Sequence, residues 1–355
     1  MDPSWTFAVG RDELTRTTVV DAAAVDIADG EALLRVERVG MTANNVTYAV
    51  LGDAFGYWRF FPAEPRGLEP SWGIVPLWGF ASVVESRAPG VEAGQRVYGY
   101  LPSASHLVVR PARVDDLGFR DGSPHRAELP SPYNAYRLTS TDDAYRADEE
   151  DLLVLFRPLF VTSFMLADYL ADNDFFGAAT VVLSSASSKT AYAAAHELRG
   201  QGPRVVGLTS PGNVAFTESL GCYDQVLAYD QVASLEPKPA VYLDLSGAPA
   251  TRAALRAHLG DRLVRDIAVG LTRQEPNIEA AGEFFFAPDQ MRKRAGDWGR
   301  GEVERRSAAA WRRFADALGA QVEVRVGHGP EALRAAWSDA VAGRTPARVG
   351  QVIQL

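Results

Sequence analysis

The sequence predicts an α/β protein that combines a doubly wound parallel sheet with a second, β-rich domain. From about residue 151, short apolar runs alternate with helix-forming segments, which is typical of parallel strands covered by helices. Before about residue 110, short alternating runs follow one another with turns between them, which indicates a set of β-strands. A chain of 355 residues is long enough for two ordinary domains.

The first part of the chain is expected to be all β up to about residue 110. The runs that alternate like half-buried strands or carry strand-forming residues lie at 32–39, 79–86, 94–100 and 106–110. Residues 111–150 are polar, with several prolines and acidic runs, and we predict an extended surface insertion there.

The second part changes to a helix and strand alternation. An apolar helix is expected over 160–170, and strands are expected at 180–183, 204–208, 225–228, 240–245 and 263–269. A charged helix over 302–318 is followed by a strand at 322–326, a helix at 331–341 and a strand at 348–353. This closing set is expected to return to the first domain. We therefore predict one domain from residues 1–150 and 319–355, and another from 151–318.

Composition limits the possible partners. The chain is 47% hydrophobic and 23% charged, as in soluble globular proteins. A net charge of −9 argues against nucleic acid or an anionic membrane as the main partner, and the basic run at 292–294 is expected to be a solvated helix face. The first ten residues lack signal-peptide features, and we find no window of about 18 apolar residues. We expect a cytoplasmic protein that acts on a small molecule, without membrane or nucleic acid.

Metal binding is not expected. Cys222 is the only cysteine, which excludes an internal disulfide and a cysteine-rich zinc site, and it is expected to be a small buried residue. The five histidines are scattered without the spacing of metal ligands.

A corner between strand and helix is the strongest candidate for a binding site. The apolar run 180–183 is followed by Ser184-Ser185-Ala186-Ser187-Ser188, and Lys189-Thr190 then opens a helix. In open parallel sheets, ligands bind beyond the carboxyl ends of the strands, where a helix N-terminus can stabilise a pyrophosphate. Small side chains replace the usual glycines here, hydroxyls add donors, and a lysine is favourable once an anion docks. The predicted cofactor-binding residues of this corner are Ser185, Ser187, Ser188, Lys189 and Thr190.

The corner has two other interpretations. A Walker loop requires glycines, including one immediately before the lysine, where Ser188 stands instead. A serine-capped helix that binds no ligand remains open.

The end of the next strand indicates which dinucleotide is bound. An NAD site usually carries Asp or Glu there, whereas this chain has Thr209-Ser210-Pro211-Gly212-Asn213. An uncharged end lined by hydroxyls can accept a 2′-phosphate, so we predict NADP(H), with Ser210 and Asn213 in contact with it. The usual arginine is missing, and Lys189 is expected to compensate. Asp244 ends the fourth strand and Ser246 follows it; residues in this position either flank the adenosine or ribose or form a turn.

Five segments in order resemble one known superfamily. They lie at 41–48, 90–99, 159–166, 284–288 and 343–349. The sequence resembles the medium-chain dehydrogenase/reductase superfamily over most of its length, in particular the zinc-free quinone-oxidoreductase-like branch. It is similar to a bacterial subfamily of unknown function that has the same serine corner. The departures are the missing glycine-rich turn, the segment 111–150, and the absence of the Cys and Gly-His-Glu segments that bind catalytic zinc in other members.

The resemblance implies a fold, a reaction and site residues. The fold is a Rossmann cofactor domain plus a GroES-like β-rich catalytic domain, and a homodimer is possible. The implied reaction is zinc-independent transfer of a hydride from NADPH to an activated double bond or a quinone-like carbonyl. The implied catalytic residues are Tyr48, as a hydrogen-bond donor or proton source, and Asn45, which with Thr162 would orient the nicotinamide carboxamide. Phe286 is expected beside the nicotinamide.

Several alternatives stay open for these residues and for the function. Tyr48 is equally well explained as a core tyrosine with a satisfied hydroxyl. Tyr57 and Trp58 are expected to line an apolar substrate pocket, although packing of the insertion would use the same residues. Besides a reductase of enones or quinones, the chain is compatible with an enzyme of this fold that carries out a non-redox tailoring or lyase-type step. It is also compatible with a non-catalytic protein that binds NADPH.

Overall fold

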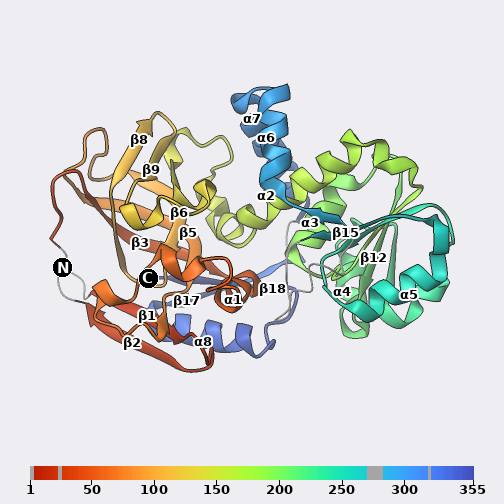
Figure 1. Ribbon diagram of the computed structural model, residues 1–355, viewed down its shortest axis with the longest axis horizontal. Helices are drawn as coiled ribbons and strands as arrows, with labels where there is room; N and C mark the ends of the chain where they lie inside the picture. The colour runs from red at the N-terminus through yellow and green to blue at the C-terminus, as the bar shows by residue number, and fades with distance from the viewer. Residues whose placement is uncertain (1–3, 23–25, 270–282, 319–320) are drawn as a thin grey trace. The chain divides into compact units, whose positions relative to one another are not determined.

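The computed structural model describes residues 4–22, 26–269, 283–318 and 321–355, and the chain divides into two compact units. Unit 1 comprises residues 1–155 and 324–355, and unit 2 comprises residues 156–323. Figure 1 shows the β-rich unit 1 with the C-terminal α8 and β18, in blue, among its red and orange strands.

Unit 1 contains two sheets. The smaller has three strands in the order β2-β1-β4, and the larger has nine, in the order β17-β18-β3-β5-β6-β10-β9-β8 with β7 paired to β3. The strands are β1 (Ser4–Gly10), β2 (Thr17–Ala22), β3 (Ala32–Met41), β4 (Trp72–Gly73), β5 (Pro76–Ser86), β6 (Arg96–Pro102), β7 (His106–Val109), β8 (Pro111–Asp115), β9 (Gly118–Asp121), β10 (Ala135–Leu138), β17 (Glu323–His328) and β18 (Val349–Gln354), and the α-helices are α1 (Ala43–Val50) and α8 (Gly329–Val341). The pairing of β18 with β3 is antiparallel and ties the C-terminal segment to this unit.

The segment 111–150 differs from the surface insertion that the sequence led us to expect. Three of its short strands join the large sheet, and β10 pairs antiparallel with β6. Phe119 and Tyr136 are buried and stack at 5.3 Å between ring centroids, and Arg126 is buried beside Asp121 at 3.2 Å. Strands of four or five residues are too short for a clear alternation of apolar and polar positions, which is why the composition suggested a solvated loop.

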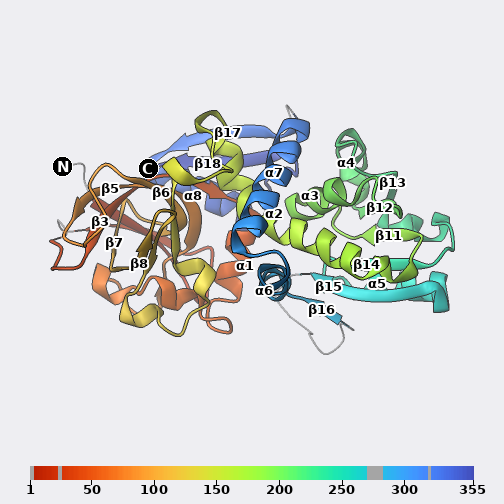
Figure 2. The same ribbon diagram turned by 90° about the horizontal axis from the view of Figure 1, so that it is seen from above.

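The described residues of unit 2 form a parallel sheet of six strands in the order β13-β12-β11-β14-β15-β16, which Figure 2 shows. Its elements are α2 (Glu150–Asp172), which begins in unit 1, then β11 (Thr180–Leu183), α3 (Lys189–Leu198), β12 (Arg204–Thr209), α4 (Val214–Ser219), β13 (Gln225–Ala228), β14 (Ala240–Asp244), α5 (Pro249–Leu259), β15 (Leu263–Val269), β16 (Glu283–Phe285), α6 (Ala287–Asp297) and α7 (Arg300–Leu318). The chain runs outward from β11 to β13 and returns to continue from β14, so the direction of winding reverses between β11 and β14. This arrangement confirms the predicted α/β class with a doubly wound parallel sheet.

Helix α2 is longer than expected, because it begins at Glu150 rather than near Phe160. The helical stretch Ala147–Asp172 is long and apolar enough, by length and composition, to cross a membrane, which the sequence analysis did not anticipate. Half of its most apolar window is buried inside the protein. A core helix meets the same criterion, so a single such helix is weak support for a membrane span.

Candidate functional site

The serine corner lies at the point where the sheet of unit 2 reverses its winding. It follows the carboxyl end of β11 and opens α3, whose first residue is Lys189. Ser188 is the N-cap of α3, and its Oγ accepts a hydrogen bond from the Ala191 amide at 3.3 Å. This is the position at which open parallel sheets bind their ligands.

Ser185 adopts the left-handed conformation, with φ of 49°, in the middle of the corner. Residues other than glycine rarely adopt these backbone angles. The Ser185 amide donates to Tyr229 Oη at 2.9 Å, and Tyr229 directly follows β13. The corner therefore keeps the turn geometry that a glycine would allow, with a side chain from another strand end satisfying one of its amides.

A glycine allows close approach of neighbouring groups, and here that glycine is Gly207 in β12 and not a residue of the turn. A Cβ on Gly207 would lie 2.8 Å from Ala186 Cβ and 3.0 Å from the Tyr223 ring. The Ala186 amide donates to the Leu208 carbonyl at 3.0 Å, and Tyr223 Oη donates to the Ala186 carbonyl at 2.9 Å. The sequence analysis looked for glycines in the turn after β11. It therefore missed Gly207, which lies within β12, before the end of that strand.

The hydroxyls of the first two strand ends are in direct contact. Ser187 Oγ accepts from Thr209 Oγ1 and from Asn213 Nδ2, each at 3.2 Å. Asn213 Nδ2 also donates to Ser210 Oγ at 3.0 Å. The structure thus brings together three predicted residues, Ser187, Ser210 and Asn213, and adds Thr209.

Lys189 and Thr190 form the first turn of α3. The Lys189 Nζ lies 5.7 Å from the centroid of the Phe156 ring, and burial lowers the pKa of the ammonium group to about 8. The Thr190 carbonyl accepts from the buried Ser163 Oγ at 2.8 Å, which joins α2 to α3. Thr162 is the partly buried neighbour of Ser163 on α2.

Asp244 is occupied by contacts within the protein. The residue is 3% exposed, and its Oδ1 accepts from Ser184 Oγ at 3.0 Å and from the Ser246 amide at 3.0 Å. Ser246 Oγ donates to the same oxygen at 2.9 Å, and Arg252 pairs with Oδ2 at 2.9 Å. Of the two roles expected for Asp244 and Ser246, this geometry favours formation of the turn after β14.

Phe286 lies just beyond the carboxyl end of β16 and is 49% exposed. It lies at the same edge of the sheet as the corner, the edge formed by the carboxyl ends of the parallel strands. It therefore remains available to a ligand.

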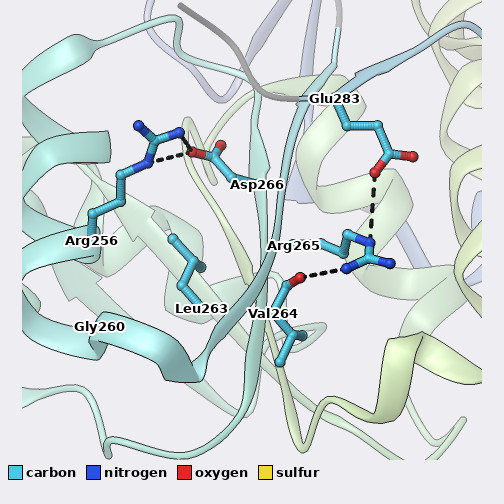
Figure 3. A pocket seen from close by; sticks show the side chains of 7 residues that line it. All are labelled: Arg256, Gly260, Leu263, Val264, Arg265, Asp266 and Glu283. Atoms are coloured by element: carbon cyan, nitrogen blue, oxygen red, sulfur yellow. Dashed lines mark hydrogen bonds and ion pairs between the residues drawn. The ribbon is translucent and has the colours of Figure 1, made fainter.

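A separate cavity of about 370 Å³ opens at the amino half of β15. It is lined by Arg256, Gly260, Leu263, Val264, Arg265, Asp266 and Glu283 (Figure 3). The Arg256 and Asp266 side chains pair at 2.7 Å, and those of Arg265 and Glu283 pair at 3.8 Å. The cavity lies at the opposite end of the strands from the corner, and these charged groups neutralise one another.

Unit 1 places the predicted residues Tyr48 and Tyr57 in a group of aromatic side chains that we call the tyrosine cluster: Tyr48, Tyr57, Phe60, Trp78, Tyr100 and Tyr133. Tyr48, on α1, is 6% exposed, and its ring lies 4.7 Å from that of Tyr57. Trp78 Nε1 donates to Tyr48 Oη at 3.1 Å, and the hydroxyls of Tyr57 and Tyr133 are 3.4 Å apart. Tyr133 also contacts the rings of Phe60 and Tyr100, at 5.4 and 4.8 Å.

Burial raises the pKa of Tyr48 well above its ordinary value, and the hydrogen bond from Trp78 acts in the opposite direction. Tyr48 is therefore neutral at physiological pH and keeps a proton to donate. Its hydroxyl is satisfied as an acceptor, so both interpretations of Tyr48, core residue and donor, are compatible with the site.

Asn45 has a structural role that the sequence analysis did not anticipate. Asn45 Oδ1 accepts from the Thr42 amide at 2.8 Å, and Asn45 Nδ2 donates to the Pro76 carbonyl at 2.9 Å. Its side chain thus caps the start of α1 and joins it to β5.

Trp58 is 3% exposed, and a Cβ on either Gly52 or Gly73 would collide with its ring, at 2.0 and 2.6 Å. Two glycines make room for the ring in the core, which favours the packing alternative for Trp58 over a place in a pocket lining. Tyr57 is partly exposed and stacks with the exposed Phe55 at 6.3 Å, so it remains accessible.

Three members of the tyrosine cluster escaped sequence reasoning. Trp78 and Tyr100 lie on neighbouring strands, where Trp78 pairs directly with Tyr100 in the β5–β6 register. Tyr133 belongs to the segment interpreted as an insertion. The run Tyr98-Gly99-Tyr100 in a predicted strand was a usable signal, since alternate residues point to one face.

Within the described residues, no group of three or more His, Cys, Asp or Glu side chains is placed to hold a metal ion. Cys222 is buried, and burial raises the pKa of its thiol to about 12. The thiol is therefore protonated and unreactive at physiological pH.

Solved structures with the same fold are similar at low sequence identity, and several of them are named as enoyl or enoyl thioester reductases. CurA from Vibrio vulnificus in complex with NADPH is 14% identical, with a TM-score of 0.60 over 99% of this chain and 98% of that chain. The Etr1p complex with NADP and crotonyl-CoA is 14% identical, with a TM-score of 0.59 over the full length of both chains. The mitochondrial 2-enoyl thioester reductase Etr1p/Etr2p heterodimer from Candida tropicalis is 12% identical, with a TM-score of 0.59, again over both full chains. These similarities show the medium-chain dehydrogenase/reductase fold.

Sequence comparison adds a family but no characterised relative. The model of a family described as a protein of unknown function, DUF2855, matches residues 39–346. The search of curated proteins found no match.

Proposed function

The chain belongs to the DUF2855 family, and on its fold and its serine corner we propose that it is an NADP(H)-dependent oxidoreductase that works without zinc. The observation that carries this proposal is the corner itself. Hydroxyls from two adjacent strand ends meet there, in front of a helix that begins with a half-buried lysine. Proteins of the same fold have been solved with NADPH and with NADP, as the names of those complexes state.

The residues of the corner fit a dinucleotide pyrophosphate. No acidic side chain occurs within 184–190 or 209–213, so an anion meets no repulsion from these two segments. Ser187, Ser188 and Thr190 offer hydroxyl donors, and the N-terminus of α3 offers backbone amides and a favourable dipole. The Lys189 ammonium, which burial disfavours in the free protein, is stabilised by a bound phosphate.

Ser210 and Asn213 are assigned to the 2′-phosphate. Both side chains lie at the end of β12 and are joined to Ser187 through Asn213. An acidic residue at this strand end would bind the ribose hydroxyls of NAD and repel the 2′-phosphate, and none is present. NADP(H) is therefore the favoured cofactor.

The proposal assigns the substrate to the tyrosine cluster of unit 1. When bound, NADPH supplies a hydride. The substrate then needs a hydrogen-bond donor or proton where negative charge develops, and Tyr48 is neutral and suited to give one. The partly exposed rings of Tyr57 and Tyr133 offer an apolar surface for an activated double bond or a quinone-like carbonyl. The complex of a fold relative with crotonyl-CoA supports the same substrate class.

The test is binding followed by turnover. Calorimetric titration with NADPH and NADH measures cofactor choice. Loss of NADPH absorbance then measures turnover on enoyl thioesters, enones, quinones and, as a control, simple aldehydes. We expect tighter binding of NADPH and turnover on at least one of the first three classes. Binding without turnover on the whole panel would contradict the reductase and favour a non-catalytic NADPH-binding protein. Conversion of a substrate without net oxidation of NADPH would favour a non-redox tailoring or lyase-type reaction.

A further inference from the structure

The tyrosine cluster contains one hydrogen bond whose direction is fixed by chemistry. Trp78 Nε1 and Tyr48 Oη are 3.1 Å apart, in β5 and α1. An indole N–H is a donor only, so the Tyr48 oxygen must accept in this contact. The proton of Tyr48 must therefore point away from Trp78 Nε1.

The Trp78 indole is held in place from several directions. Its ring stacks on Tyr98 at 5.7 Å and lies 5.0 Å from Tyr100. The next residue, Gly79, has no room for a side chain, because a Cβ there would lie 2.1 Å from the Arg38 carbonyl oxygen. This close packing of β5 on β3 fixes the backbone beside Trp78, so the donor is oriented before any ligand arrives.

The contact matters most when Tyr48 loses its proton. A phenolate in a buried site is unfavourable, and burial raises the pKa of Tyr48 accordingly. Hydrogen bonds to a charged oxygen are roughly twice as strong as those between neutral groups. The side chains of Trp78, Asn44 and Tyr133 all act to lower the pKa of Tyr48, with Trp78 first among them.

We infer that Trp78 is a positioning residue for Tyr48. Its indole N–H keeps the Tyr48 proton turned away from Trp78 and stabilises the Tyr48 oxygen while that proton passes to the substrate. The inference rests on the proposed reduction. The incoming hydride displaces the electron pair of the substrate double bond. In the proton step the Tyr48 O–H bond breaks, and the displaced pair forms the new bond to that hydrogen. Solvent then returns a proton to Tyr48.

The inference is tested first in the free protein, without cofactor or substrate. A fluorinated tyrosine at position 48 ionises in an accessible pH range, and its ultraviolet absorbance reports the pKa of that hydroxyl. Trp78→Phe removes the N–H and keeps an aromatic ring, so we expect this pKa to rise by about one unit, the effect of losing one hydrogen bond. Trp72→Phe is the matched control, because Trp72 packs on Arg16 at 4.3 Å instead of on the cluster, and it should leave the pKa unchanged.

If Trp78→Phe does not fold, the benzothiophene isostere of tryptophan at position 78 removes the N–H with the ring shape retained. An unchanged pKa would overturn the inference.

The second test is a double-mutant cycle on turnover. Trp78→Phe should lower kcat about tenfold in the wild-type background, with little change in KM. In the Tyr48→Phe background the same substitution should have no further effect, because its target hydroxyl is gone. An equal loss of kcat in both backgrounds would assign Trp78 to packing and overturn the inference. A pKa shift in a protein that reduces none of the substrates would contradict the proposed reduction, and the positioning of Tyr48 by Trp78 would stand.

Discussion

The backbone amide of Ser185 donates a hydrogen bond to the hydroxyl of Tyr229, at 2.9 Å. These residues lie 44 positions apart, one in the turn after β11 and the other directly after β13. The contact spans the end of β12, the strand that lies between them in the sheet. It holds a left-handed serine in the corner that we propose as the phosphate site.

Removing the Tyr229 hydroxyl should therefore loosen the corner. Tyr229→Phe leaves the Ser185 amide without its partner, and a lost hydrogen bond of this kind costs about 1–3 kcal/mol. We expect NADPH affinity to fall by about tenfold and the melting temperature of the free protein to drop by a few degrees. Calorimetry and thermal unfolding measure both. Tyr223→Phe is the control. It also removes a tyrosine hydroxyl near the corner, but that hydroxyl donates to the Ala186 carbonyl instead of accepting from the Ser185 amide. Full affinity in Tyr229→Phe would show that the contact does not align the phosphate site.

Replacing Ser185 by glycine should have the opposite effect on stability. A left-handed conformation costs a non-glycine residue about 1–2 kcal/mol, and Ser185 has φ of 49°. Because glycine is also more flexible in the unfolded chain, we expect a net gain of about 0.5–1 kcal/mol in the free energy of unfolding. NADPH affinity should be unchanged if the site depends on the Ser185 amide, which glycine retains, and not on the Ser185 hydroxyl. A clear loss of affinity with unchanged stability would assign the hydroxyl to the cofactor.

Lys189 gives the site a dependence on pH. The pKa of its ammonium is lowered from 10.5 to about 8 in the free protein, so the charged form that binds a phosphate is lost as pH rises through about 8. NADPH affinity should therefore decrease above that pH. The stability of the free protein, in contrast, should increase as pH rises above about 8. Between about pH 8 and the ordinary lysine pKa the unfolded chain binds the extra proton, so the free energy of unfolding contributed by this group rises with pH.

Lys189→Met keeps the length of the side chain and removes the titrating group. It should weaken NADPH binding by about tenfold to a hundredfold at pH 7, as expected for loss of a charge-assisted contact, and abolish the decrease above pH 8. Affinity that still decreases with the same midpoint in this variant would place the titration elsewhere. Affinity equal to that of the wild type would leave the corner a capped helix without a ligand.

Gly207 provides a steric test of the corner. Gly207→Ala would place a methyl group 2.8 Å from Ala186 Cβ and 3.0 Å from the Tyr223 ring, so the turn must move. Such overpacking typically costs about 1–3 kcal/mol, and we expect both stability and NADPH affinity to fall. Gly212→Ala is the matched control, because nothing lies within 4 Å of its Cβ position. Equal effects of the two substitutions would show that the packing around Gly207 is not what shapes the site.

The parts of this site that the sequence predicted are those that local patterns determine. The strand 180–183 was predicted with its observed bounds, and the next helix with its observed start at Lys189, because an apolar run, a serine cap and an alanine-rich helix agree locally. The parallel sheet followed from the repeated alternation. The three-residue strand β16 was missed, since three residues carry no periodicity.

The tyrosine cluster depends instead on tertiary pairing. Tyr48 and Trp78 are 30 positions apart and meet only because α1 packs on β5. Tyr133 reaches them because β9 and β10 extend the large sheet, a pairing hidden in a polar, proline-containing segment. Asn45 shows the converse case. Its sequence position suggested a contact with the cofactor, whereas the start of α1 uses both ends of its amide.

Ser210 offers the most direct test of cofactor choice. It follows β12, and Asn213 Nδ2 donates to its Oγ at 3.0 Å. Ser210→Asp places a carboxylate where NAD sites carry one, so it should accept the ribose hydroxyls of NADH and repel the 2′-phosphate of NADPH. We expect NADPH affinity to fall by about a hundredfold and NADH affinity to rise, which inverts the order of the two. Ser210→Asn keeps the size of the new side chain without its charge and should lower NADPH affinity only slightly. If Ser210→Asp leaves the preference unchanged while the protein stays folded, the 2′-phosphate does not lie at the end of β12, and the assignment of Ser210 and Asn213 is wrong.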